Sequence, residues 1–192
     1  MSTSRDTASG EGYGDELVIL DGRALPVAAA YELVSAVYAS TDAFVSSFVE
    51  AYPSPERFEE RLAELARRPG SLFLAAQAGD EALGFLFVEP RPQRKLRHTS
   101  ESHMGVRAEA RGRGVGERLL AAAREQLRRA GLIEIVYLMV RADNAPARRL
   151  YERAGFTVLA TLVNDTKIDG AYYDGVLMRL AVGEPEASLP SE

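Results

Sequence analysis

Six residues near the middle of the chain, Arg111-Gly112-Arg113-Gly114-Val115-Gly116, constrain its fold and function more than any other stretch. They follow a strand-like run that ends at Val106, and they precede a helical pattern over residues 117–130 with apolar side chains every three or four positions. Glycines let backbone N–H groups approach an oxyanion, and the first N–H groups of a helix have no partner within it. Together with arginines that suit phosphate, the stretch predicts a site for a di- or polyphosphate.

Two common phosphate-binding motifs do not fit this stretch. The lysine followed by Ser or Thr that marks a P-loop is absent, and the spacing of Gly112, Gly114 and Gly116 departs from GxGxxG. Without the rest of the chain, a glycine-arginine turn that binds nothing explains the six residues equally well.

Composition narrows the class of protein. A chain of 192 residues suits one domain with a sizeable core, and its net charge of −5 argues against a general nucleic-acid binder. It has no cysteine, two histidines without ligand-like spacing and no apolar run long enough for a bilayer. We therefore expect a cytoplasmic protein with no metal, nucleic acid or membrane partner. Residues 15–182 are expected to form a single domain between a disordered tail (1–14) and a flexible tail (183–192).

Periodicity and turn residues predict the order of the elements. Strands are expected at residues 17–20, 98–106 and 133–140, and hairpins at 71–89 and 156–180. Helices are expected at residues 27–39, 41–50, 55–69, 117–130 and 144–155, the second of them capped by Thr41-Asp42. This order predicts a mixed α/β sheet with helices on both sides. Gly105, inside a predicted strand, predicts a bulge or a close backbone approach.

The order and three motifs resemble the GNAT superfamily of acyl-CoA-dependent N-acyltransferases. The motifs are Arg111-x-x-Gly114-x-Gly116 after a strand, Asn144 followed seven residues later by Tyr151, and the closing hairpin around Asp169-Gly170. The resemblance covers about residues 17–180. It implies the GNAT fold, with a mixed, mostly antiparallel central sheet of six to seven strands flanked by helices. It also implies transfer of an acetyl group from acetyl-CoA, as co-substrate, to an amine that attacks the thioester directly.

The resemblance assigns a role to the glycine-rich stretch. The pyrophosphate of acetyl-CoA would lie on residues 111–116, and its pantetheine arm between two strands that splay apart. A bulge at Gly105 would free an N–H near Val106 for the thioester oxygen. The residues expected to bind the cofactor are Met104, Gly105, Val106, Arg111, Gly112, Arg113, Gly114, Val115, Gly116 and Asn144.

Two residues are candidates for catalysis. Tyr151 matches the family's usual general acid, although its spacing also fits a core aromatic on an amphipathic helix. Glu101 lies on the strand before the cofactor site, where several GNAT enzymes carry a carboxylate that acts directly or through water, so the resemblance makes it the candidate base. Burial would raise its pKa toward a useful range. His103 shares its strand parity and is a rival, so the base is left open between the two side chains and water.

The acceptor is the least determined part of the site. Residues 38–52 and 164–173 correspond to the family's variable acceptor walls, and we expect substrate binding by Phe44, Phe48, Tyr172 and Tyr173. Aromatic and acidic side chains suit a primary amine on a small molecule. A protein N-terminus or lysine, and a non-catalytic acyl-CoA-binding domain, are the alternatives, and a homodimer is compatible with the sequence.

Overall fold

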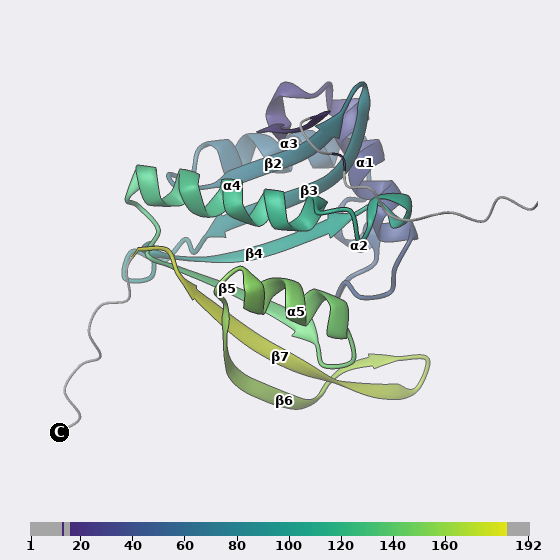
Figure 1. Ribbon diagram of the computed structural model, residues 1–192, viewed down its shortest axis with the longest axis vertical. Coiled ribbons are helices and arrows are strands. Elements are labelled where there is room, and N and C mark those ends of the chain that lie inside the picture. Colours follow the sequence, from purple (N-terminus) through teal and green to yellow (C-terminus); the bar gives the residue numbers. More distant parts are fainter. Residues whose placement is uncertain (1–12, 14–15, 184–192) are drawn as a thin grey trace, which may run out of the picture.

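The computed structural model describes residue 13 and residues 16–183, and a seven-stranded sheet forms its centre (Figure 1). The predicted tails therefore lie outside the described residues, except for Tyr13 and Gly183. The strand order is β1-β2-β3-β4-β5-β7-β6, and only the β4–β5 pair is parallel among the described strands. The strands are β1 (Leu17–Asp21), β2 (Leu72–Ala78), β3 (Glu81–Pro90), β4 (Thr99–Val106), β5 (Ile135–Arg141), β6 (Thr157–Ile168) and β7 (Ala171–Ala181). The predicted mixed, mostly antiparallel sheet is thereby confirmed.

Helices cover both faces of this sheet (Figure 1). They are α1 (Val27–Ala39), α2 (Phe48–Ala51), α3 (Pro55–Ala66), α4 (Val115–Ala130) and α5 (Ala145–Arg153), with short 3-10 turns η2 (Gly22–Ala24) and η3 (Ala108–Ala110). Helices α4 and α5 lie on one face, and α1 and α3 lie on the other. Because successive side chains of a strand point to opposite faces, β2 and β3 supply both cores. Phe73, Phe85 and Phe87 pack toward α1 and α3, and Leu74, Leu86 and Val88 pack toward α4.

The helix predicted over residues 41–50 is wrong at its start. Residues 41–47 form an irregular loop, and α2 begins only at Phe48, where Ser47 and Glu50 form a capping box. The side chain of Thr41 accepts a hydrogen bond from the N–H of Ala43, which closes a turn instead of capping a helix. Loop 41–47 lies at the ends of β4 and β5, because Phe44 approaches Gly105 and Asp42 pairs with Arg141.

The two parallel strands separate after three residue pairs. Strands β4 and β5 pair at Thr99–Ile135, Ser100–Val136 and Glu101–Tyr137 and no further. Beyond that point β4 stays on β3, whereas β5 follows β7 along its whole length. The space between the diverging strands, which we call the notch, is thus bordered by the second half of each strand.

Backbone groups of β4 face the notch. At the end of this strand the N–H of Arg107 donates to the carbonyl oxygen of Leu83 in β3. Alternate residues of a strand direct their N–H and C=O groups to opposite sides, so Ser102, Met104 and Val106 direct theirs away from β3. These three residues therefore offer hydrogen-bonding groups along one wall of the notch.

The bulge predicted at Gly105 is absent from the β3–β4 pair. Its register is continuous, and Gly105 lies opposite Phe85. The glycine instead allows a close approach of α1, because a Cβ atom here would overlap with Cγ1 of Val37 and lie 3.1 Å from Cζ of Phe44. The N–H groups that a bulge would have freed are made available by the separation of the strands.

The outer strand β6 is irregular. Its register against β7 shifts between Val158 and Ala160 and again between Leu162 and Thr166. Within the second shift Asn164 adopts a left-handed conformation (φ 57°), and its N–H donates to Oδ1 of Asp174. The strand thus pairs with β7 in separate segments.

We expect Gly105→Ala to lower the free energy of unfolding by about 1–3 kcal/mol, the usual cost of overpacking. Urea denaturation measures the change. Adding Val37→Ala should recover part of the loss, because it removes the methyl group that the new Cβ meets. An equal loss in both backgrounds would show that Val37 does not resist the substitution.

Candidate active site

A cavity of about 600 Å³, here called the cofactor cavity, opens at the notch on the face that carries α4 and α5. It is bordered by β4, the turn before α4, the end of β5 and the start of α5. The structure brings nine of the ten predicted cofactor-binding residues into its wall. They are Met104, Gly105, Val106, Arg111, Gly112, Gly114, Val115, Gly116 and Asn144, and Arg113 is not among the lining residues.

The turn before α4 presents backbone N–H groups to the cofactor cavity. Gly112 (φ 73°) and Gly114 (φ 84°) are left-handed, which non-glycine residues rarely adopt. Gly114 is the N-cap and supplies no side-chain bond to the first turn. The first hydrogen bond of the helix runs from the N–H of Arg118 to the oxygen of Gly114, so the three N–H groups at 115–117 have no partner in the helix. The turn therefore has the backbone arrangement that an anion cradle requires.

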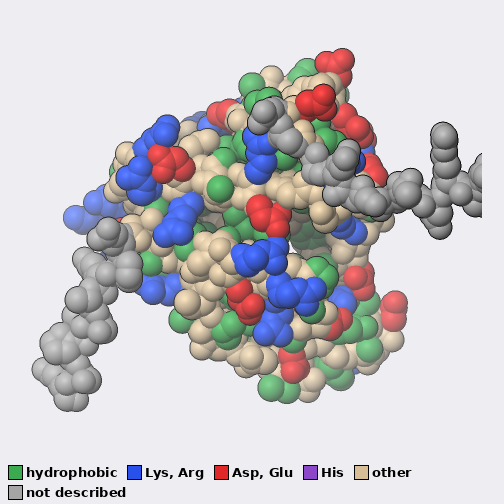
Figure 2. Space-filling model, in the orientation of Figure 1, with side chains coloured by type: hydrophobic (Ala, Val, Ile, Leu, Met, Phe, Trp, Pro, Cys, Tyr) green, Lys and Arg blue, Asp and Glu red, His purple; other side chains and the backbone are tan. Residues whose placement is uncertain are grey.

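Basic side chains border this cradle. Figure 2 shows Lys and Arg side chains gathered on the face that carries α4 and α5, and Arg149 and Arg153 of α5 line the cofactor cavity. Arg153 pairs with Glu117, which also lines the cavity, so it is the charge of Arg149 that adds to the positive potential at the start of α4 and favours a polyphosphate.

The two arginines of the cradle make contacts within the chain. Arg111 donates to the carbonyl oxygen of Val106 and to the side chain of Ser40, at the start of the loop before α2. The guanidinium of Arg113 lies 3.7 Å from the ring centre of Tyr13 and donates to its hydroxyl. The cradle is consequently formed by backbone rather than by these two side chains.

Two residues of the wall also have structural roles. A Cβ at Gly116 would lie 2.8 Å from Cδ2 of Leu150, so the glycine lets α4 pack closely against α5. Asn144 is the N-cap of α5, and its Oδ1 accepts from the N–H of Ala147. This capping bond leaves the amide group of Asn144 in the cavity wall.

Tyr151 lines the cofactor cavity from α5. Its ring packs edge-to-face against Phe156, with ring centres 5.7 Å apart. Burial raises the pKa of its hydroxyl to about 12. The phenol is therefore protonated at neutral pH and available as a hydrogen-bond donor.

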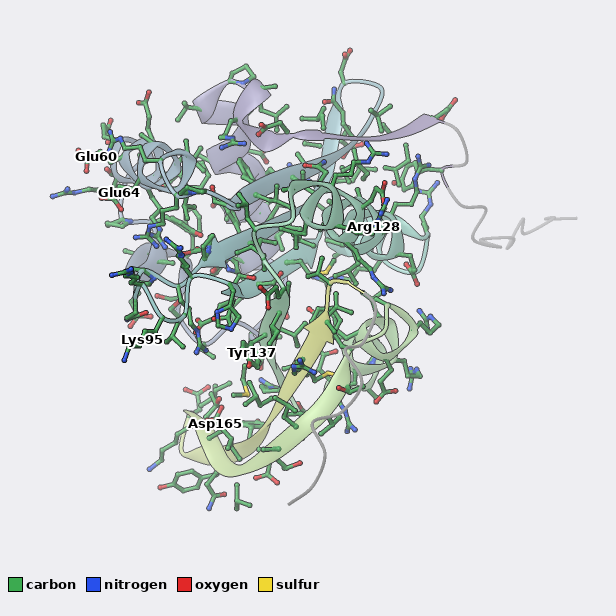
Figure 3. All side chains as sticks on the ribbon, turned by 90° about the vertical axis from the view of Figure 1, so that its left-hand side faces the viewer. Glu60, Glu64, Lys95, Arg128, Tyr137 and Asp165 are labelled. Carbon is green, nitrogen blue, oxygen red and sulfur yellow. The ribbon has the colours of Figure 1, made fainter. Side chains whose placement is uncertain are left out.

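A second cavity of about 710 Å³, here called the acceptor cavity, lies on the opposite face of the sheet. In Figure 3 the elements that border it share one side of the molecule: α3, labelled at Glu60 and Glu64, the loop of Lys95, and Tyr137. The two cavities have five lining residues in common: Ala43, Phe44, Ser102, His103 and Met139. They meet where β4 leaves β5, so a group bound on one face can reach a group bound on the other.

One of the four predicted acceptor residues reaches a cavity. Phe44 lines both cavities and stacks on Tyr38 at 4.0 Å between ring centres. Phe48 packs into the aromatic core of α1 and α3, and Tyr172 and Tyr173 lie on the β6–β7 hairpin outside both linings.

Glu101 lines the acceptor cavity but is not buried. Its side chain is 67% exposed and pairs with Arg91 at 3.0 Å between Oε1 and Nη2. The burial expected to raise its pKa is therefore absent. Glu101 nevertheless lies directly beside the notch, because it belongs to the last residue pair between β4 and β5.

His103 is enclosed between aromatic rings. It stacks on Phe87 at 5.0 Å between ring centres, and its Nε2 lies 3.5 Å from the hydroxyl of Tyr52. Burial lowers its pKa to about 4, with a smaller contribution from the positive charge of Arg61. The imidazole is thus neutral at pH 7 and a much weaker base than an ordinary histidine.

The sequence analysis missed a charged cluster in the acceptor cavity, formed by Glu89 of β3, Arg61 of α3 and Arg68 after α3. Glu89 forms an ion pair with Arg61, and its side chain is only 20% exposed. Burial raises its pKa, partly opposed by the two arginines. The sequence did contain a sign of this position. Alternate residues of a strand point to the same side, so Glu89 shares the side of Phe85 and Phe87, which point into the core.

Within the described part of the chain, no group of three or more potential ligands is placed to hold a metal ion. The helices of that part are all too short or too polar to cross a membrane.

Comparison with known proteins gives concordant matches. Residues 37–156 match the Acetyltransferase (GNAT) family. The L-amino acid N-acetyltransferase AaaT of Escherichia coli is 26% identical over 148 residues, covering 77% of this chain and 90% of that protein. The L-methionine sulfoximine/L-methionine sulfone acetyltransferase of Pseudomonas aeruginosa is 30% identical over 126 residues, covering 65% and 72%. The family match confirms the resemblance seen in the sequence.

Solved structures share the fold. The crystal structure of a GNAT phosphinothricin acetyltransferase from Sinorhizobium meliloti, in complex with AcCoA, superposes with a TM-score of 0.76 at 19% identity. The superposition covers 92% of this chain and 94% of that one. The predicted GNAT fold is confirmed.

The low pKa of His103 predicts acid sensitivity. Between pH 4 and the ordinary histidine pKa of about 6.5, the unfolded chain binds a proton at this position that the folded chain does not. This stabilising contribution is complete above pH 6.5 and is lost as the pH falls toward 4, by up to about 3 kcal/mol. His103→Gln should flatten this part of the profile, measured by urea denaturation between pH 4.5 and 7.5. The same slope in parent and variant would contradict the assignment.

Proposed function

Because the chain belongs to the GNAT family of acetyltransferases, we propose that it acetylates a primary amine on a small-molecule acceptor, with acetyl-CoA as co-substrate. The amine would attack the thioester directly. The observation that supports this most is the meeting of two cavities, one on each face of the sheet, at the notch.

The residues around the cofactor cavity suit acetyl-CoA. The free N–H groups at 115–117 and the left-handed glycines would hold the pyrophosphate. The backbone groups of Ser102, Met104 and Val106 line the notch, where the amides of a pantetheine arm would find donors and acceptors. The co-substrate brings an acyl carbon activated by a thiol leaving group.

In the reaction the amine nitrogen bonds to the acyl carbon, the carbon–sulfur bond breaks, and a proton passes from the amine to solvent or a base. Tyr151 would donate a hydrogen bond to the departing sulfur. Full proton transfer from a phenol with a pKa of about 12 to a thiolate with a pKa of about 8.5 is uphill by about 5 kcal/mol. The proposed role is therefore stabilisation of the developing thiolate, followed by protonation from water.

Glu101 is the proposed base for the amine. It lies in the acceptor cavity beside the notch and is accessible to water, which can carry the proton between the two groups. Access to water favours Glu101 over its rival, because His103 is enclosed between aromatic rings.

The shape of the acceptor cavity favours a small molecule over a protein segment. Loop 41–47, α3 and the β3–β4 loop contribute to its wall, and its volume of about 710 Å³ is in the range of small-molecule sites. The relatives from E. coli and P. aeruginosa are named for L-amino acid and methionine sulfone substrates. A protein N-terminus or lysine would need a groove open at both ends.

Free thiol release from acetyl-CoA tests the function. Purified protein should release thiol with at least one amino acid or other small amine and give the N-acetyl product by mass spectrometry. Turnover with peptides alone would replace the small-molecule proposal with the peptide alternative. Absence of turnover with both classes, while acetyl-CoA binds, would favour the non-catalytic alternative.

Tyr151→Phe should lower kcat by up to about 10²-fold, because the sulfur loses its hydrogen-bond donor. The affinity for acetyl-CoA, measured by calorimetry, should stay the same since the ring is retained. An unchanged kcat under conditions where chemistry limits turnover would leave Tyr151 with a packing role only.

Glu101→Gln should lower kcat/KM strongly and remove the acid-side limb of its pH profile, because the amide cannot accept a proton at neutral pH. His103→Gln is the matched control and should keep that limb. If the limb disappears in the histidine variant instead, the base assignment is reversed, and if it survives in both, no side-chain base is required.

A further inference from the structure

The charges that line the acceptor cavity do not balance. Three arginines and two glutamates contribute to its wall: Arg61, Arg68, Arg91, Glu89 and Glu101. Glu89 pairs with Arg61, which also pairs with Glu64 outside the cavity wall, and Glu101 pairs with Arg91. One positive charge, that of Arg68, has no carboxylate of its own.

Arg68 is partly buried and held in place by its backbone. Its N–H donates to the oxygen of Leu65, and its own oxygen accepts from the N–H of Ser71, which fixes the turn after α3. No side-chain hydrogen bond or ion pair is formed by its guanidinium with any residue in the described part of the chain. Glu89 is near enough to respond to its charge, but the hydrogen bonds of Glu89 go to Arg61.

An arginine in this setting has unused binding capacity. The guanidinium presents five N–H donors in a planar fork that matches a carboxylate, and such bonds are stronger in a partly dehydrated site than in water. A second anion beside Glu89 is tolerated only where positive charge exceeds negative charge, as it does here. A neutral amine would leave the donors of Arg68 without a partner.

We propose that Arg68 is a specificity-determining residue that binds a carboxylate of the acceptor, so that the substrate class is an amine that also carries a carboxylate, as amino acids do. The proposal rests on the small-molecule acetyltransferase function above. The amine would lie toward Glu101 and the notch, and the carboxylate toward Arg68. The reversed orientation is disfavoured, because the amine would then face Arg68 and the carboxylate would face Glu101, each a like charge.

Matched acceptor pairs test the proposal. Each pair consists of an amino acid and the amine that lacks its carboxylate: L-methionine sulfone with 3-(methylsulfonyl)propylamine, L-phenylalanine with phenethylamine, and 6-aminohexanoate with hexylamine. For at least one pair the parent protein should prefer the acid, with kcat/KM higher by about tenfold or more. Arg68→Gln should remove this preference by raising KM for the acid about ten- to a hundredfold, and should change the amine less than about threefold.

Arg67→Gln is the matched control, since Arg67 is the exposed neighbour in the same turn and does not line the cavity. It should keep the parent's preference. Arg68→Lys, which keeps the charge without the fork, should retain part of it. Thermal melting of each variant identifies any loss of folding, and the Lys variant provides a readout if the Gln variant does not fold.

Three results would overturn the proposal. Equal kcat/KM for acid and amine in every pair would exclude a carboxylate subsite while leaving the acetyltransferase function intact. A preference that survives in folded Arg68→Gln would assign the subsite to another residue. Failure of every small amine and amino acid would overturn both the subsite and the small-molecule function.

Discussion

The position of both cavities depends on one feature of the sheet, which is that β4 and β5 stop forming hydrogen bonds with each other halfway along their length. A sheet interior normally pairs every backbone group, yet these strands stop pairing after Glu101 and Tyr137. The continuous pairing of β5 with β7 and of β4 with β3 keeps each strand in place while the two diverge. The opening therefore needs no strained backbone, and it connects the two faces of the sheet at the one position where both cavities end.

The two sides of the notch differ in where their charge comes from: backbone N–H groups on the α4 side and ionised side chains on the α3 side. On the α4 side, backbone groups at the start of a helix create positive potential, while Arg111 bonds to Val106 and Ser40 and Arg113 bonds to Tyr13. Loop 41–47 is tied by Arg111 through Ser40 and by Arg141 through Asp42, from opposite sides of the notch. On the α3 side, charged side chains are paired across elements, which partly offsets the cost of burying a carboxylate such as Glu89.

The sequence was most informative where local chemistry determines structure. Glycines with positive φ, the Asn144 cap and hydrophobic periodicity predicted the strands, α4, α5 and the turn before α4, because each depends on residues close in sequence, whereas the other residues of the cofactor cavity were implied by the family resemblance. The bulge at Gly105 was a wrong prediction since the reason for this glycine is Val37, on a helix far away in the sequence. The acceptor cavity depends on such long-range contacts throughout: Arg61 and Glu89 become neighbours only when α3 packs on β3, and no local pattern reports their pairing.

The irregular outer strand has a consequence for contacts between molecules. Strand β6 is at the edge of the sheet and exposes apolar side chains, including Val158, Leu159 and Val163. A straight edge of this kind would be a template for strand addition and aggregation. The two register shifts and the left-handed Asn164 break its row of N–H and C=O groups into short segments, so an incoming strand could form few consecutive bonds. The edge of β6 is in this way protected from polymerisation by its backbone rather than by charge.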